Sequence, residues 1–141
     1  NEANSTYLWA ARQAVSDGQR GLASTLGGGV VIAKPGRSVV EVLTRWDGLP
    51  DDRVIALDER DGQVMVGTAQ GAALLEDGVV VEVWDAILPD PYVQAVLIGT
   101  EGLWMGTYQG LARIGILLCD GGLQLFEELC FVCMDVETCR Q

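Results

Sequence analysis

The feature of this sequence that most constrains its fold is an internal repeat with a period of about 40 residues. Leu49-Pro50-Asp51 recurs 39 positions later as Leu88-Pro89-Asp90. Gly67-Thr68-Ala69-Gln70-Gly71 recurs at the same offset as Gly106-Thr107-Tyr108-Gln109-Gly110. Two separated motifs that share one offset rarely arise by chance, so the sequence indicates several copies of one structural unit.

Weaker copies extend the repeat on both sides of this pair. Upstream, Thr25 and Gly28 match Thr68 and Gly71 with a slightly larger offset, which indicates a small difference in loop length. Downstream, a strand pattern begins again at residues 129–135. The sequence therefore predicts units over residues 1–46, 47–85 and 86–128, followed by residues 129–141 as the first strand of an incomplete unit or a tail.

Each unit reads as four short strands. In the best copy, apolar segments over residues 54–57, 64–66, 72–75 and 79–84 are too short for stable helices. Asp61-Gly62 and Asp77-Gly78 are typical of tight β-hairpin turns, because glycine adopts left-handed conformations without strain. Gly27-Gly28-Gly29 lacks the lysine of a phosphate-binding loop and is expected to form a turn between strands two and three. The unit is predicted to be a four-stranded antiparallel meander.

Several of these strands are apolar on both faces, including Val79-Val80-Val81 and Leu103-Trp104-Met105. Such a sheet has to be covered on both sides, and the sequence offers no helices to cover it. Sheets stacked face to face around an axis meet this requirement. We therefore predict an all-β fold, a partial β-propeller of four-stranded antiparallel blades. Trp46, Trp84 and Trp104 are expected in the core or between blades.

The third unit carries a specific family resemblance. Residues 102–114, preceded by Leu88-Pro89-Asp90 and Val93, resemble the propeller repeat of bacterial two-component regulators, and residues 48–71 are similar to it. The resemblance implies a periplasmic or extracellular sensing module, joined in that family to a signalling domain and usually many blades long. The repeats also resemble those of secreted and cell-surface proteins without a kinase.

Three blades and one further strand do not close a ring, because propellers close with about four to eight blades. Two explanations are open. The chain is either a piece of a longer propeller or one half of a ring that two copies complete.

Composition excludes several classes of function. Nine basic and twenty acidic residues give a formal charge of −11, which repels nucleic acid and anionic membranes. The absence of histidine removes Ser-His-Asp and Cys-His catalysis together with histidine metal ligation. We expect no enzyme and no cofactor, although a glycosidase needs only two suitably placed carboxylates and stays open.

The four cysteines, Cys119, Cys130, Cys133 and Cys139, all lie near the end of the sequence. Cys130 and Cys133 fall in a strand-like segment, where residues three apart point to opposite faces and do not share a metal ion. We expect buried or free thiols and no metal site, with one or two disulfides as the alternative in an exported protein.

In a propeller, ligands meet the face formed by the loops that precede the innermost strands and by the turns between strands two and three. These loops form a polar rim for a ligand, or they are simply turn formers. The candidate ligand-binding residues are Asp51, Asp52, Arg53, Asp90, Tyr92, Gln70, Tyr108 and Gln109.

The expected function is binding of a ligand or partner, as the sensing part of a larger bacterial signalling or cell-surface protein in the periplasm or outside the cell. The expected ligands are a saccharide, a peptide or a protein, but not nucleic acid or a membrane. The remaining blades would come from the same parent chain or from a second copy. The alternatives are a structural module that closes a ring by self-association and a fragment of a carbohydrate-active enzyme.

Overall fold

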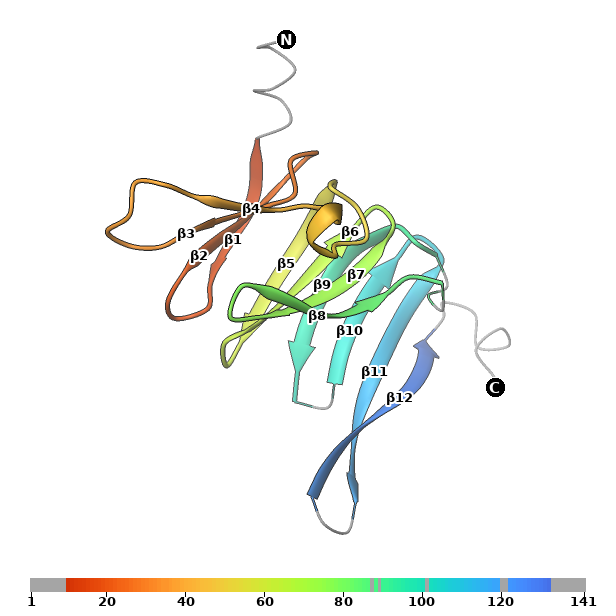
Figure 1. The fold of residues 1–141 in the computed structure, drawn as a ribbon. Helices are drawn as coiled ribbons and strands as arrows, with labels where there is room; N and C mark the ends of the chain where they lie inside the picture. Colours follow the sequence, from red (N-terminus) through yellow and green to blue (C-terminus); the bar gives the residue numbers. More distant parts are fainter. Residues whose placement is uncertain (1–9, 87, 89, 101, 120–121, 133–141) are drawn as a thin grey trace.

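The structure, a computed structural model, describes residues 10–86, 88, 90–100, 102–119 and 122–132, with side chains up to Ile114. Over this part of the chain, strands form three four-stranded antiparallel sheets (Figure 1). The first sheet contains β1 (Ala11–Ser16), β2 (Gly21–Thr25), β3 (Val30–Ala33) and β4 (Glu41–Leu43). The second contains β5 (Val54–Arg60), β6 (Gln63–Thr68), β7 (Gly71–Glu76) and β8 (Val79–Trp84). The third contains β9 (Val93–Gly99), β10 (Gly102–Thr107), β11 (Gly110–Cys119) and β12 (Gly122–Val132).

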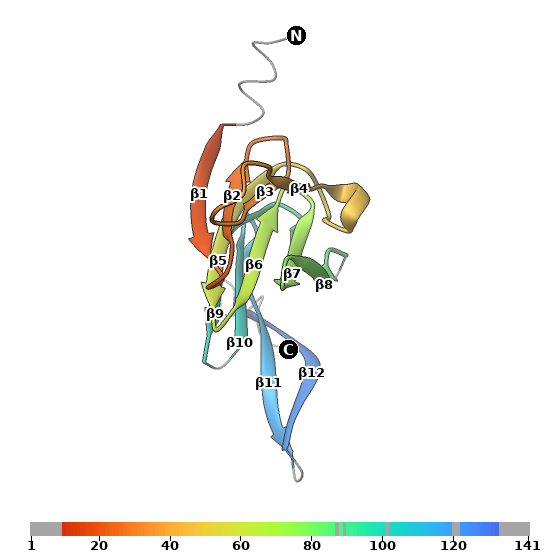
Figure 2. The same ribbon diagram turned by 60° about the vertical axis from the view of Figure 1, so that its left-hand side comes forward.

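Each sheet is a meander in which consecutive strands pair in chain order. The first strands of the sheets are neighbours, since β5 contacts both β1 and β9. Figure 2 shows these three strands along one side of the molecule, with β4 and β8 on the other. A single 3-10 turn, η1 (Arg45–Asp47), lies in the loop between the first and second sheets. The predicted all-β fold with four-stranded antiparallel blades is confirmed.

The two hairpin turns of the second sheet have the predicted geometry. Asp61 and Gly62 have φ angles of 52° and 86°, and Asp77 and Gly78 have φ angles of 53° and 77°. Two successive residues with positive φ form the type I′ turn, whose twist matches that of the flanking strands.

A threonine closes the turn between the second and third strands of each sheet. Thr68 Oγ1 donates a hydrogen bond to the carbonyl of Gly71 (2.8 Å) and accepts one from the N–H of Gln70 (3.1 Å). Thr107 repeats both bonds, to the Gly110 carbonyl at 2.8 Å and from the Gln109 N–H at 3.1 Å. The repeated Gly-Thr motif thus encodes a turn in which one hydroxyl satisfies two backbone groups.

The first sheet has the same turn with one extra residue. Thr25 Oγ1 donates to the carbonyl of Gly29 at 2.8 Å and accepts from the N–H of Gly28 at 2.9 Å. Gly29, and not Gly28 as the sequence match suggested, is therefore the counterpart of Gly71. The glycine run does form the predicted turn between strands two and three.

The core consists of two apolar layers, one in each gap between sheets. The layer between the first and second sheets contains Leu22, Val30, Ile32, Leu49, Val54, Leu57, Val64, Val66, Ala73 and Leu75. The layer between the second and third contains Met65, Ala72, Leu74, Trp84, Leu88, Val93, Ile98, Leu103, Met105, Ala112 and Ile114. The second sheet is thus covered on both faces, as its apolar strands predicted.

Two core predictions are wrong. Trp46 is 87% exposed, because η1 holds it on a loop outside the stack, whereas Trp84 is buried and Trp104 half-buried. Val79 and Val81 in β8 are 60% and 46% exposed. Since β8 is the outermost strand of its sheet, one of its faces lies beyond the cover of the neighbouring sheet.

The third sheet ends differently from the prediction. The segment expected to start a further unit at residue 129 continues β12, in which Leu129 pairs with Ile114 and Val132 with Leu111. The pairing register of β11 and β12 shifts between Ile114 and Ile116. The two strands stay paired on both sides of this shift, so β12 is one continuous strand. Cys130 is part of this strand, while Cys133 and Cys139 lie outside the described residues.

A partly buried ion pair anchors the turn between β1 and β2. Asp17 Oδ1 accepts the N–H groups of Gln19 (2.9 Å) and Arg20 (2.7 Å), and Oδ2 lies 3.0 Å from Arg20 Nη1. Burial of the Asp17 carboxyl raises its pKa, but the two N–H bonds and the guanidinium outweigh this and hold the pKa below its ordinary value of 3.8.

We predict that replacing Thr68 with valine lowers the free energy of unfolding by about 1–3 kcal/mol, because the buried Gly71 carbonyl and Gln70 N–H lose their partner. Urea denaturation measures the change. Thr107→Val is the matched control, with a smaller loss because Thr107 is only half-buried and water can replace its hydroxyl. Equal losses in the two variants would contradict the role assigned to burial.

Asp17 should make the fold sensitive to acid. Because its folded pKa lies below 3.8, the stabilisation is present above that pH and is lost as the pH falls through and below it. Asp17→Asn should therefore lower the melting temperature at neutral pH, and the difference from the unmodified chain should shrink in acid. Thermal melts across this range test the prediction, and a difference that grows in acid would contradict it.

Candidate functional site

The loops predicted to form a ligand-binding rim are tied together at one end of the sheets. The N–H of Gly29 donates to the carbonyl of Asp52 (2.8 Å), and the N–H of Ala69 donates to the carbonyl of Arg53 (3.1 Å). The loop before β5 is thus bonded to the β2–β3 turn and to the β6–β7 turn. We call the loops 44–53 and 85–92, with the turns 26–29, 69–70 and 108–109, the rim.

An aromatic stack joins the rim at the third sheet. The rings of Tyr92 and Tyr108 lie with centroids 4.8 Å apart and planes 21° from parallel. Tyr92 belongs to the loop before β9, and Tyr108 belongs to the β10–β11 turn. Tyr108 is 65% exposed, so the stack presents an aromatic surface to solvent.

The rim aspartates shape the loops that carry them. Asp52 Oδ1 accepts the N–H of Arg45 (2.8 Å), and Asp51 Oδ1 accepts the N–H of Asp52 (2.9 Å). Asp90 Oδ1 accepts the N–H of Tyr92 at 2.8 Å, which positions the stacked ring. These contacts are those of turn formers. A role of the aspartates in binding a ligand stays a prediction.

A groove of about 460 Å³ opens on the rim between the second and third sheets. Both apolar and polar side chains line it. Its lining residues are Pro50, Gln70, Asp85, Ala86, Leu88 and Pro91. Pro91 precedes Tyr92 in the chain, so the loop that forms this part of the groove wall also carries one ring of the aromatic stack.

The structure brings some of the predicted site residues together and separates others. Gln70 lines the groove, and Asp90, Tyr92 and Tyr108 follow on its Pro91 side. Gln109 lies in the same turn as Tyr108, with its N–H held by Thr107. Asp51, Asp52 and Arg53 do not line the groove, although Pro50 of the same loop does; the Asp52 and Arg53 carbonyls accept the N–H groups of Gly29 and Ala69.

Sequence reasoning missed part of this site. Asp85 and Ala86 line the groove. Trp84-Asp85 repeats Trp46-Asp47 ahead of the Leu-Pro-Asp motif, and this repeated pair is the signal that could have located Asp85. Pro50 and Leu88 were visible as members of the two Leu-Pro-Asp motifs. Trp46 was expected in the core, yet it is an exposed rim residue with the Arg45 guanidinium 5.9 Å from its ring centroid.

Two further hollows outside the rim involve residues of the first sheet. One, of about 270 Å³, runs across the first strands and is lined by Arg12, Gln13, Ile55, Ala56, Leu57, Gln94, Ala95 and Val96. Gln13 has a structural bond there, since its Oε1 accepts the N–H of Leu57 at 2.8 Å. Asp58 likewise accepts the N–H of Ile98 at 2.7 Å. These side chains link neighbouring sheets, which accounts for their position without a ligand.

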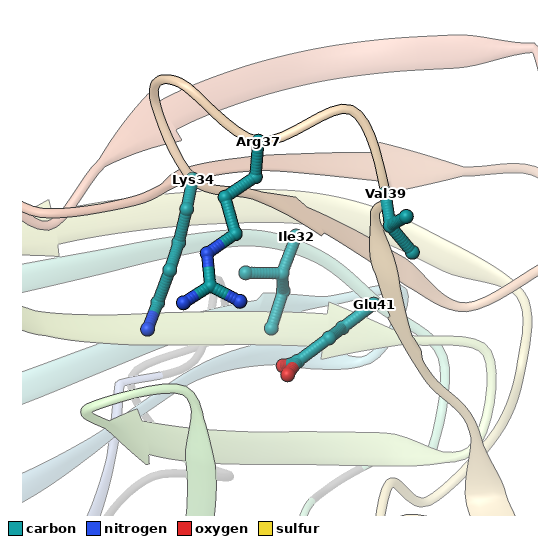
Figure 3. A pocket seen from close by; sticks show the side chains of 5 residues that line it. All are labelled: Ile32, Lys34, Arg37, Val39 and Glu41. Atoms are coloured by element: carbon teal, nitrogen blue, oxygen red, sulfur yellow. The ribbon is translucent and has the colours of Figure 1, made fainter.

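The other hollow, of about 120 Å³, lies under the β3–β4 loop at the opposite end of the first sheet (Figure 3). The Arg37 N–H donates to the Lys34 carbonyl at 3.2 Å, and this turn sets the two cationic side chains side by side. Glu41 lies across from them, with Ile32 between. Lys34, Arg37 and Glu41 are all exposed, so this small hollow is open to solvent.

The rim is acidic. Its two long loops carry five aspartates, at positions 47, 51, 52, 85 and 90, and two arginines, at positions 45 and 53. An excess of negative charge at a concave surface disfavours polyanionic ligands. Among the described side chains, no group of three His, Cys, Asp or Glu residues is placed to hold a metal ion. The expectation of no cofactor stays a prediction.

Comparison with known proteins supports the fold. No protein-family model matches the sequence, and no curated protein matches it. Among solved structures, the chain is similar to the extracellular domain of BT3049 from B. thetaiotaomicron, described as a hybrid two component system, with 16% identity and a TM-score of 0.59. The match covers 84% of this chain and 17% of that one. It shows an all-β, partial propeller-like fold, in the type of protein that the repeat resembles.

The Tyr92–Tyr108 stack should couple the two rim segments energetically. In a cycle of Tyr92→Ala, Tyr108→Ala and the double variant, we expect a coupling free energy of about 0.5–1.5 kcal/mol. Chemical denaturation of the four proteins gives this value. Strictly additive losses would contradict a stack that holds the rim together.

Proposed function

We propose that this chain is a binding module that takes its ligand at the rim, and that it is the sensing part of a larger bacterial signalling or cell-surface protein. The observation that carries the proposal is the exposed Tyr92–Tyr108 stack beside the groove at the second and third sheets. Both features are built from loops held by the stacked sheets, the usual location of binding residues.

The groove has the properties of a ligand site. Its volume of about 460 Å³ lies within the range of about 300–1,000 Å³ that is typical of small-molecule sites. Pro50, Leu88 and Pro91 supply apolar walls, while Gln70 and Asp85 supply an amide and a carboxylate. This combination can contact an apolar ring face and also hydrogen-bond to hydroxyl groups.

The ligand that best fits this surface is a neutral saccharide, with a short peptide as the second candidate. A sugar ring would lie on Tyr108 and direct its hydroxyl groups to Gln70 and Asp85. The five rim aspartates act against sulfated or phosphorylated ligands. The same charge argues against nucleic acid and anionic membranes as partners.

A place outside the cytoplasm is part of the proposal. One solved structure to which the chain is similar is an extracellular domain of a two-component system protein. Within the described residues, none of the helical structure is long or apolar enough for a membrane span. Signalling itself would require an effector domain, and the remaining blades would come from the parent chain or from a second copy.

Calorimetric titration with panels of neutral oligosaccharides, acidic oligosaccharides and short peptides tests the function. We expect saturable binding of a neutral oligosaccharide, and Tyr108→Ala should weaken it at least about tenfold, the loss of one good contact. Arg37→Gln, at the opposite end of the first sheet, is the control and should bind normally. Binding that survives Tyr108→Ala, or no binding by any panel member, would contradict the rim site.

A further inference from the structure

Two sheet faces are not covered by the part of the chain that the structure describes. The outer face of the third sheet carries Ala95, Leu97, Trp104, Gly106 and Leu111, which surround a hollow of about 210 Å³. Leu97 is 53% exposed, and the Arg113 guanidinium lies 5.6 Å from the Trp104 ring centroid. This is a largely apolar surface in contact with water.

The outer face of the first sheet follows from strand alternation. Leu22 and Ile32 point into the core between the first and second sheets, so their neighbours in the chain point the other way. The residues on this outer face include Ala14, Ser16, Gly21, Ala23, Val31, Ala33 and Val42. Most of them are small.

The repeat shows what normally covers a face like that of the third sheet. At the same offset of 39 residues, the second sheet has Met65 in place of Trp104 and Ala72 in place of Leu111. Both are fully buried against the third sheet. At these two positions the outer face of the third sheet therefore carries the pattern of a covered face with bulkier side chains, whereas Arg113 stands in the place of buried Leu74.

The outer face of the first sheet deviates in the opposite direction. The matching Thr-Gly turns align Ala23 with Val66 in the second sheet and Met105 in the third. Strand pairing aligns Ala14, opposite Ala23, with Leu57, opposite Val66. Gly21 likewise takes the place of Val64 and Leu103, and Ala33 that of Leu75 and Ile114. This face has the pattern of an incoming blade, with smaller side chains.

We propose that two copies of this chain associate head to tail, with the outer face of the third sheet of one copy packed against the outer face of the first sheet of the other. Large side chains on one face then meet small ones on the other, which lets the layer reach the packing density of a protein interior. A contact between two copies of the same face would instead place large side chains against large ones, or small against small.

A head-to-tail contact between two copies can occur twice and close. The two faces differ, so each copy uses its third sheet for one contact and its first sheet for the other. With three sheets from each copy, the assembly falls within the range of about four to eight blades that closed propellers have.

Sedimentation velocity under reducing conditions tests the proposal, since a reductant removes any dimer held by disulfides. The unmodified chain should sediment as a dimer. Trp104→Glu and Leu97→Glu, on one face, and Ala23→Glu, on the other, should each give folded monomers. Trp46→Glu, on the exposed rim loop, is the matched control and should stay dimeric. A monomeric unmodified chain, or a dimer that survives all three face variants, would overturn the proposal.

Mixing two variants distinguishes this contact from a symmetric one. A pair of one Trp104→Glu chain and one Ala23→Glu chain keeps one intact contact, because the Ala23→Glu chain has a normal third sheet and the Trp104→Glu chain a normal first sheet. The mixture should therefore form dimers that neither variant forms alone. A mixture that stays monomeric would overturn the head-to-tail arrangement.

Discussion

The second sheet depends on a close approach at Gly67 that leaves little room for a Cβ atom. The second sheet is apolar on both faces, so its neighbours have to come near enough to exclude water from both. At Gly67, a Cβ atom would lie 3.1 Å from the backbone oxygen of Val93 and from the Val96 side chain. The third sheet therefore packs directly onto the backbone of β6. The order of the sheets, and with it the position of the rim, follows from this contact.

The positions of the rim loops depend on the packing of the three sheets that carry them. The sheets pack face to face, so the loop before β5 reaches the β2–β3 turn of the first sheet as well as the β6–β7 turn of its own sheet. The N–H groups of Gly29 and Ala69, in these two turns, donate to carbonyls of that loop. The loop before β9 is placed in the same way and stacks Tyr92 on Tyr108. The rim and the core share residues, because Leu49 and Leu88 on the two long rim loops belong to the two core layers.

Most of the fold could be predicted from the sequence because the same motifs occur in two successive units. The offset between the Leu-Pro-Asp motifs located the second and third units, and the Asp-Gly pairs located the hairpins. The exposure of β8 was missed because apolar composition does not show which strand is outermost, and that of Trp46 because composition does not show that η1 places it on a loop. The groove was harder still, because Asp85 and Ala86 lie in an irregular loop that is placed only by the packing of two sheets.

The packing of the third sheet on the second is tested most directly by comparing the stability of the Gly67→Ala variant with that of the Gly106→Ala variant. These glycines occupy the same position in successive repeats, but a Cβ at Gly106 would meet only its neighbour Ala95, at 3.4 Å. Gly67→Ala should lower the free energy of unfolding by about 1–3 kcal/mol, the cost of overpacking, while Gly106→Ala should change it little. Equal effects of the two substitutions would mean that the third sheet does not pack on β6, and would contradict the fold described above.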